Sequence, residues 1–358
     1  MKLNVTLPIS QLSLGQVSLN FLKEFHKKNI DCSIFPIGNV DLNPFSVSSE
    51  FKNWLESSIK NRYSKLDKNA PTFRCWHLNG SESRLSEKQV LYTFHETDTL
   101  TNEEIALAKH QTKVIFSSEY SDNIAKINGV PNSSYVPLGL DDEFVKIPDL
   151  GVQQTHWVLI GKAEHRKCTQ RIVNIWSKIY GNNRNHLLTL LIHNPFFSEE
   201  HNNAIVGGCF ENGKKPYNVM VLKPLATNKE VNMLINSADI DLSGLSMGEG
   251  WGLPSFNATA LGKWSIVNNA TAHKSWANEK NCVLINPNSK IPCYDGVFFV
   301  EGREFNQGNF WNYSNESLVE AMKKAEKLAK TPNLEGEKLA TEFTYSKSVD
   351  KILEQISS

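Results

Sequence analysis

Short runs of β-branched and aromatic residues alternate along this chain with stretches in which apolar residues recur every three or four positions. In the first half, the runs predict strands at residues 2–7, 31–35, 72–78, 90–94 and 114–117. The second half predicts strands at residues 156–160, 187–193, 218–222, 240–243, 264–267 and 283–285. Amphipathic patterns predict helices at residues 17–28, 317–330 and 345–356. Apolar strands separated by helices are typical of parallel sheets that helices cover on both faces.

A polar stretch, residues 141–155, separates the two series of strands and is broken by Pro148 and Gly151. A chain of 358 residues is long enough for two cores. We therefore expect an α/β protein with one domain over residues 1–150 and a second over residues 151–340. Each domain is expected to be doubly wound, with ligand sites at the carboxyl ends of its strands and a crevice between the domains as the natural binding site.

The composition is that of a globular protein, with 40% hydrophobic and 21% charged residues. Lys+Arg and Asp+Glu both number 38, which argues against binding mainly to nucleic acid or an anionic membrane. No apolar run approaches the roughly 18 residues of a membrane span, and the N-terminal apolar run is too short for a signal peptide. The six scattered cysteines form no CxxC pair, so we expect reduced thiols in a cytoplasmic protein.

A glycine-rich turn around Glu249 is the most informative segment. Its glycines lack a Cβ and allow a ligand to approach the backbone (Gly248, Gly250 and Gly252). Pro254 suits the first turn of a helix, which we predict over residues 254–261. The free N–H groups at that helix end favour an anion, and the nearby carboxylate favours hydroxyl groups. A diphosphate joined to a sugar would suit both, although a structural tight turn would give the same pattern.

A basic loop, residues 161–167, directly follows the strand at residues 156–160. It carries three cations, Lys162, Arg166 and Lys167, which together can neutralise a diphosphate. A solvated surface loop is the alternative explanation.

Two further loops follow strands of the first domain. His95 lies at the carboxyl end of the strand at residues 90–94, where it could contact a ligand or be a hydrogen-bonded structural residue. Gly15 follows the first strand and could allow close approach of a ligand or simply start a helix.

Metal binding is not expected. Asp239 and Asp241 form a DxD sequence, but no cluster of oxygen ligands surrounds them. His273, soon after the strand at residues 264–267, could also reach the crevice, although we favour His95 over it as a site residue.

In their order and spacing these pieces resemble glycosyltransferase family 4. The segment SMGEGWGL at residues 246–253 resembles the family's E-G-F-G-L-P segment, and IGK at 160–162 with Lys167 resembles its G-R-x-x-x-x-K loop. Residues 114–121 and 136–141 resemble the end of its first domain, and residues 343–345 resemble the segment that opens its final helix. The resemblance implies the GT-B architecture: two Rossmann-like βαβ domains facing a central crevice, with a C-terminal helix at residues 341–358 that crosses back to the first domain.

The resemblance also implies roles for individual residues. Lys162 and Lys167 would bind the donor diphosphate, with Gly15 beneath the phosphates, and His95 would lie near the far hydroxyls of the sugar. Glu249 would hold the transferred sugar, so the implied catalytic residues are Glu249, His95 and Lys167. The remaining donor-binding positions follow Glu249 in sequence (Gly250, Trp251, Gly252, Leu253 and Asn257).

Two positions depart from the family pattern. Asn257 stands where the family usually has a second glutamate that accepts hydrogen bonds from the ribose, and an amide lacks the charge that strengthens such a bond. Lys162 stands where the family has arginine, so the two-pronged contact of a guanidinium is lost.

The function implied is transfer of a hexosyl or pentosyl unit from a nucleotide-diphosphate sugar to an acceptor hydroxyl, with retention of anomeric configuration. No metal and no cofactor besides the donor is expected. The acceptor could be a glycan, a lipid-linked sugar or a modified base in DNA; residues 43–71, rich in aromatic and basic side chains, could dock it or form an ordinary amphipathic helix. The alternatives are a glycosyltransferase for hydroxymethylated DNA bases, a sugar-nucleotide epimerase and a non-catalytic sugar-nucleotide-binding protein.

Overall fold

The computed structural model describes residues 1–148 and 150–357, which form two compact units. The first unit contains Met1–Glu143, Glu301–Gly308 and the C-terminal residues from Phe343 on; the second contains Phe144–Val300 and Asn309–Glu342. The sequence predicts a boundary after residue 150 and places residues 301–308 in the second domain, whereas the second unit begins at Phe144 and residues 301–308 belong to the first unit.

Part of the predicted linker, residues 141–155, is packed into the second unit, and Asp149 lies outside the described residues. The backbone N–H of Val145 donates to Asn232 Oδ1 at 3.1 Å, and that of Ile147 donates to Asn236 Oδ1 at 3.0 Å. These two amide side chains supply the hydrogen bonds that the extended backbone would otherwise lack.

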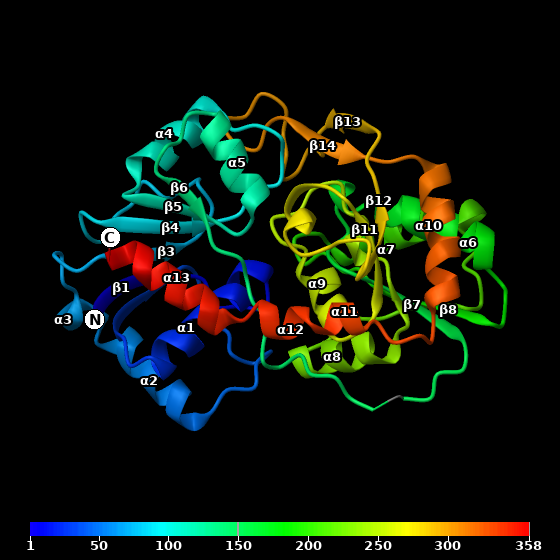
Figure 1. Cartoon of the computed structure of the whole chain (residues 1–358), viewed down its shortest axis with the longest axis horizontal. Coiled ribbons are helices and arrows are strands. Elements are labelled where there is room, and N and C mark those ends of the chain that lie inside the picture. Colours follow the sequence, from blue (N-terminus) through cyan, green and yellow to red (C-terminus); the bar gives the residue numbers. More distant parts are fainter. Residues whose placement is uncertain (149, 358) are drawn as a thin grey trace. The chain divides into compact units, whose positions relative to one another are not determined.

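The first unit is a parallel sheet of six strands covered by helices (Figure 1). The strand order is β2-β1-β3-β4-β5-β6. The strands are β1 (Lys2–Leu7), β2 (Asp31–Pro36), β3 (Thr72–Cys75), β4 (Gln89–Thr93), β5 (Lys113–Phe116) and β6 (Ser133–Tyr135). The helices are α1 (Ser13–Lys27), α2 (Ser49–Lys60), α3 (Arg62–Lys65), α4 (Asn102–His110), α5 (Glu119–Ile127) and α13 (Tyr345–Ser357).

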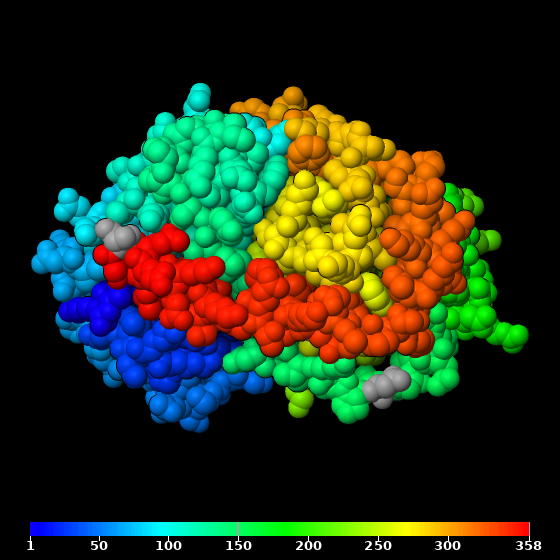
Figure 2. Space-filling view, viewed as in Figure 1, coloured from blue at the N-terminus to red at the C-terminus, as the bar shows by residue number. Residues whose placement is uncertain are grey.

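The C-terminal helix α13 completes the first unit. The Phe21 ring on α1 packs edge-on against Tyr345, with ring centroids 5.7 Å apart. Ser348 Oγ donates to the backbone oxygen of Pro137 at 2.6 Å, and Leu140 forms a parallel bridge with Thr344. In Figure 2 the red C-terminal residues lie against the blue N-terminal ones. The predicted return of the last helix to the first domain is therefore confirmed.

The second unit is a parallel sheet of the same size, in the order β12-β11-β10-β7-β8-β9 (Figure 1). Its strands are β7 (Thr155–Ile160), β8 (His186–Leu191), β9 (Val219–Val221), β10 (Ile240–Asp241), β11 (Trp264–Asn268) and β12 (Cys282–Ile285). Its helices are α6 (Thr169–Tyr180), α7 (Glu199–Gly208), α8 (Asn228–Ser237), α9 (Leu253–Ala260), α10 (Asn315–Leu328), α11 (Leu334–Glu337) and α12 (Leu339–Glu342). An antiparallel hairpin, β13 (Ser289–Pro292) with β14 (Asn309–Asn312), was not predicted.

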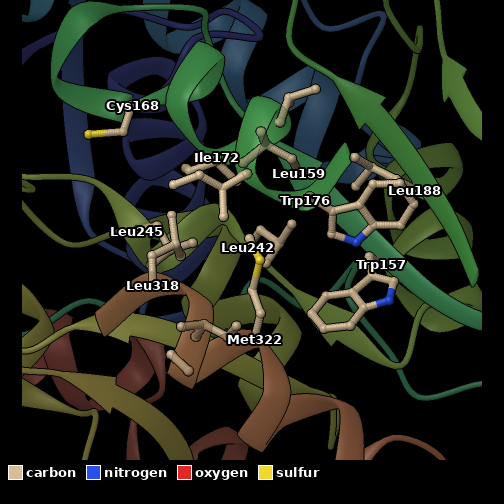
Figure 3. Close-up of a cluster of buried hydrophobic side chains, with 14 of the residues drawn as sticks. Trp157, Leu159, Cys168, Ile172, Trp176, Leu188, Leu242, Leu245, Leu318 and Met322 are labelled. Carbon is tan, nitrogen blue, oxygen red and sulfur yellow. The ribbon is translucent and has the colours of Figure 1, made fainter. Parts of the chain in front are cut away.

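The core of the second unit lies between its sheet and helices α6 and α10 (Figure 3). Trp157 on β7 and Trp176 on α6 are fully buried there, together with Met322 on α10. Burying such large apolar side chains is the main favourable term in forming the unit. The predicted α/β architecture with two parallel sheets is confirmed. Within the described residues, no helix is long and apolar enough to cross a membrane.

Candidate functional site

Three neighbouring strands of the second unit, β10, β7 and β8, end at one edge of its sheet. The loop after β10 carries Glu249, the loop after β7 carries Lys162 and Lys167, and the loop after β8 carries Phe196. Because parallel strands present all their carboxyl ends at the same edge, these loops form the position at which α/β folds bind ligands.

Glu249 is the centre of a buried cluster of charges. Its carboxylate oxygen Oε1 accepts a hydrogen bond from Lys167 Nζ and lies 3.1 Å from Arg166 Nη1. Arg166 Nη1 also donates to the backbone oxygen of Gly248 at 2.7 Å, so it holds the loop as well as the carboxylate. The side chains of Glu249, Arg166 and Lys167 are only 7%, 9% and 13% exposed, so water screens these interactions weakly.

The two cations determine the charge state of Glu249. Burial by itself raises the pKa of a carboxyl group, because the carboxylate loses its hydration. The charges of Lys167 and Arg166 outweigh burial and hold the pKa of Glu249 well below its ordinary value of 4.5. Glu249 is therefore ionised at neutral pH and can accept, but not donate, hydrogen bonds.

Lys162 lies in the same loop but has different neighbours. Its Nζ is 2.6 Å from Glu164 Oε1 and lies 5.1 Å and 5.2 Å from the ring centroids of Phe196 and Phe298. Glu164 Oε2 also pairs with Arg166 Nε at 3.0 Å. Burial raises the pKa of Glu164, but the charges of Arg166 and Lys162 bring it below its ordinary value.

The cluster as a whole contains three cations and two carboxylates (Lys162, Arg166, Lys167, Glu164 and Glu249). With all five groups ionised, the net charge is 3 − 2 = +1. The basic loop is thus largely neutralised by the chain's own acids rather than being a solvated surface loop. A bound anion would gain from the excess charge and from side chains that are already held in place.

Among the three predicted loop glycines, Gly252 is the one with a left-handed backbone, at φ 84°. It immediately precedes α9, which begins at Leu253 and ends at Ala260, one residue earlier at each end than predicted. A Cβ on Gly252 would lie 2.6 Å from His273 Nε2. Glycine is therefore required by both the backbone angle and the neighbouring imidazole.

His273 lies in a short 3-10 helix, Thr271–Ser275, and is fully buried. Its Nδ1 is 3.0 Å from the backbone oxygen of Asn268, so Nδ1 carries the proton and Nε2 has a free lone pair. Nε2 has no hydrogen-bond partner among the described residues. Burial lowers the pKa of His273 to about 4, so the ring is neutral at neutral pH. The structure thus places a neutral acceptor beside the Glu249 loop.

The remaining predicted donor-binding residues surround the start of α9. Gly250 and Trp251 lie in the loop between Glu249 and Gly252, and both are buried. Leu253 is the first residue of α9, and Asn257, 6% exposed, lies one turn further along the helix.

His95 lies in the first unit, two residues beyond the end of β4. It is 6% exposed, and its Nε2 is 3.1 Å from Thr97 Oγ1. Burial lowers the pKa of His95 below its ordinary value. The hydrogen bond to Thr97 and the burial of His95 agree with a structural role, which was one of the two alternatives from the sequence. The position of His95 after the end of a strand is also compatible with contact to a ligand.

Gly15 lies in the first turn of α1, and the chain itself explains why it is glycine. A Cβ on Gly15 would overlap the backbone nitrogen and oxygen of Ser10. The close approach anticipated at Gly15 is thus made by the β1–α1 loop, which folds over the start of the helix.

The segment at residues 43–71 forms α2 and α3, and α2 is amphipathic. Phe51 and Leu55 are buried, and the Trp54 ring lies 5.1 Å from that of His26 on α1. Tyr63 on α3 is 72% exposed. The apolar face of α2 is thus used for packing within the first unit, as in an ordinary amphipathic helix.

The DxD residues Asp239 and Asp241 serve the fold. Asp239 Oδ2 accepts from the backbone N–H of His156 at 2.8 Å and pairs with Lys330 at 2.9 Å. Asp241 is fully buried, and burial raises its pKa to about 6. In the part of the chain that the structure describes, no group of three or more His, Cys, Asp or Glu side chains could hold a metal ion.

Sequence reasoning counted Arg166 only as one of three cations and gave no role to Glu164 or Phe196. The alternation of acid and base in KAEHRK was the available signal for Glu164 and Arg166. Phe196 gave no such signal, because an aromatic residue after a strand usually belongs to a core.

Neither a protein-family model nor a curated protein matches this sequence. Solved structures do share its fold. Sucrose-phosphate synthase from Thermosynechococcus elongatus has a TM-score of 0.73 at 11% identity, covering 99% of this chain and 98% of the other. HepE from Anabaena, solved with UDP and glucose, has a TM-score of 0.67 at 13% identity, covering 100% and 99%. The trehalose-6-phosphate synthase OtsA has a TM-score of 0.67 at 9% identity, also covering 100% and 99%. The fold is therefore GT-B, as predicted.

Proposed function

We propose that this chain is a glycosyltransferase of the family 4 type, which moves a hexosyl or pentosyl unit from a nucleotide-diphosphate sugar to an acceptor hydroxyl. The observation that carries the proposal is the ionised Glu249 carboxylate, held by Lys167 and Arg166 beside the N-terminus of α9. Structures of the same fold include HepE with UDP-glucose, which supports a nucleotide sugar as the donor.

The positive charges of the loop would act on the leaving group. Glycosyl transfer builds negative charge on the departing diphosphate, and cations already in place stabilise that charge more than the ground state. Lys162, Arg166 and Lys167 supply this charge in our proposal, so neither a metal nor another cofactor is assigned a role. Removing one such group typically costs about 3 kcal/mol of barrier.

Side chains that accept hydrogen bonds would orient the nucleotide-sugar donor. Glu249 would accept hydrogen bonds from hydroxyl groups of the transferred sugar, and Asn257 would accept from the ribose. The backbone of Gly250–Leu253 would approach the phosphates.

Retention of anomeric configuration is part of the proposal. The Glu249 carboxylate is already paired with two cations, which suits a group that positions the sugar better than one that attacks it. We therefore propose that the acceptor hydroxyl attacks from the face that the diphosphate leaves. A product of inverted configuration would contradict this step.

For the glycosyl acceptor we propose only a chemical class: a glycan, a lipid-linked sugar or a modified base in DNA. We propose that the enzyme acts in the cytoplasm. The even balance of 38 acidic and 38 basic residues favours a carbohydrate acceptor over DNA, because DNA binding relies on excess positive charge.

The test is a panel of nucleotide sugars, scored for release of nucleoside diphosphate by wild type, Glu249→Gln and Glu279→Gln. Gln has the shape of Glu without its charge, so we expect at least about a 100-fold loss of release from one donor in Glu249→Gln. Glu279 is exposed, and its variant is expected to match wild type. Circular dichroism checks that both variants are folded.

Three results would contradict the proposal. Full activity in Glu249→Gln would remove the assigned role of the carboxylate. Donor binding without release, whatever the acceptor, would favour a binding-only protein, and conversion of the donor without an acceptor would favour an epimerase.

A further inference from the structure

Phe196 lies in the loop between β8 and α7 and is 55% exposed. The chain contains 18 phenylalanines, and in the part that the structure describes the other phenylalanines are buried or half-buried. A ligand that covers the ring would gain hydrophobic free energy, because it removes apolar surface from water.

The loop that carries Phe196 is joined to the basic loop by one fully buried side chain, Asn194. Asn194 Oδ1 accepts from the backbone N–H of Phe196 at 3.1 Å, and its Nδ2 donates to the backbone oxygen of Ala163 at 3.3 Å. The backbone N–H of Ala163 donates to Ile192 at 3.1 Å. The two loops are thus held to each other, and the ring is held at a set place beside the basic loop.

Two neighbours orient the Phe196 ring. Lys162 Nζ lies 5.1 Å from its centroid, and the Phe298 ring packs against it at 5.5 Å with an interplanar angle of 73°. These contacts leave more than half of the side chain exposed. An aromatic ring already oriented in this way loses little conformational entropy when it stacks on a flat ligand.

The order of the strands indicates which part of the donor reaches this ring. Along the sheet edge, the Glu249 loop after β10 is followed by the Lys162 loop after β7 and then by the Phe196 loop after β8. A nucleotide-diphosphate sugar has the same order of parts: sugar, diphosphate and nucleoside. With the sugar at Glu249 and the diphosphate at the lysines, the nucleoside extends toward β8.

We propose that Phe196 is a nucleotide-recognition residue, on whose exposed ring the nucleobase of the donor stacks. The inference rests on the proposed function, since it needs a nucleotide donor at this sheet edge. Lys162 then has two tasks, because it contacts the diphosphate and keeps the stacking ring oriented.

The test compares ligands that have or lack a base. The affinities of the full-length protein for UDP, ADP, GDP and inorganic diphosphate are measured by calorimetry. Phe196→Leu is expected to weaken the tightest-binding nucleotide at least about five-fold, the low end of base-stacking contributions. It should change diphosphate binding less than about two-fold, because diphosphate has no base to stack. Phe196→Trp should keep nucleotide affinity, and Tyr217→Leu, which removes another exposed aromatic side chain of the second unit, should change neither.

Two outcomes would overturn the inference while leaving the proposed function standing. Equal weakening of nucleotide and diphosphate would mean that Phe196 acts through Lys162, and unchanged nucleotide binding in Phe196→Leu would mean that the base lies elsewhere. Wild-type protein that binds neither nucleotide nor diphosphate would overturn the proposed function and this inference together.

Discussion

Replacing Gly252 by alanine tests the loop geometry at the start of α9. Gly252 has φ 84°, and a left-handed backbone costs a residue with a Cβ roughly 1–2 kcal/mol. The new Cβ would lie 2.6 Å from His273 Nε2, so the buried imidazole has to move, and overpacking of this kind typically costs about 1–3 kcal/mol. Together these effects predict a loss of about 2–5 kcal/mol in the free energy of unfolding of the second unit.

Urea unfolding followed by tryptophan fluorescence is a suitable assay, because six of the eight tryptophans lie in the second unit (Trp157, Trp176, Trp251, Trp264, Trp276 and Trp311). Gly296→Ala is the matched control. Gly296 has φ 75°, but no atom lies within 4 Å of its added Cβ. This variant should show the backbone cost alone, about 1–2 kcal/mol.

The difference between the two variants isolates the effect of His273. Gly252→Ala should cost less in a His273→Ala background than in the wild type, because the two side chains compete for one space. The reasoning is refuted if Gly252→Ala is no more destabilising than Gly296→Ala, or if Gly252→Ala costs as much in the His273→Ala background as in the wild type.

Two further predictions concern stability. Gly15→Ala should lower the free energy of unfolding by about 1–3 kcal/mol, because its Cβ would overlap the Ser10 backbone. The control Gly207→Ala should not destabilise the protein, because Gly207 lies in α7 and no atom lies within 4 Å of the added Cβ. Equal urea midpoints for the two variants would contradict this prediction. The pKa of His273 is about 4 in the folded protein and 6.5 in the unfolded chain, so the unfolded chain binds more protons between these pH values. The free energy of unfolding should therefore rise from pH 4 to pH 6.5, by up to about 3 kcal/mol. His273→Gln should abolish this rise, whereas the control variant His110→Gln, at an exposed histidine, should show the same rise as the wild type. If the urea midpoint of His273→Gln depends on pH as it does in the wild type, the buried ring does not titrate as described.

Strand positions could be predicted closely, because a strand buried on both faces needs an apolar run. β1 was predicted at residues 2–7 and is Lys2–Leu7, and β10 and β11 begin at their predicted residues. β6 was missed because Ser133 and Ser134 make it polar, and the β13–β14 hairpin was missed because its first strand, SKIP, has little apolar pattern. These short strands depend on pairing with neighbours rather than on their own residues.

The parts of the candidate site that are formed by residues adjacent in sequence could be predicted. The Glu249 turn and the Lys162–Lys167 loop are each readable from a few adjacent residues, but the ion pair between Lys167 and Glu249 joins positions 82 residues apart. Sequence reasoning therefore counted the cations of the basic loop but could not show that the distant Glu249 pairs with two of them. The contact of Lys162 with Phe196 was hidden for the same reason.

The first unit is built from segments that are far apart in the chain, and this has a consequence during synthesis. Ser348 on α13 bonds to Pro137, 211 residues away, and the Tyr345 ring packs against Phe21. A ribosome delivers the strands of the first unit long before it delivers α13, so the first unit is completed only after the second unit has been made. Until then, the aromatic face of α1 that later receives Tyr345 stays open to water, and a nascent chain of this kind is a natural client for chaperones that shield apolar surface.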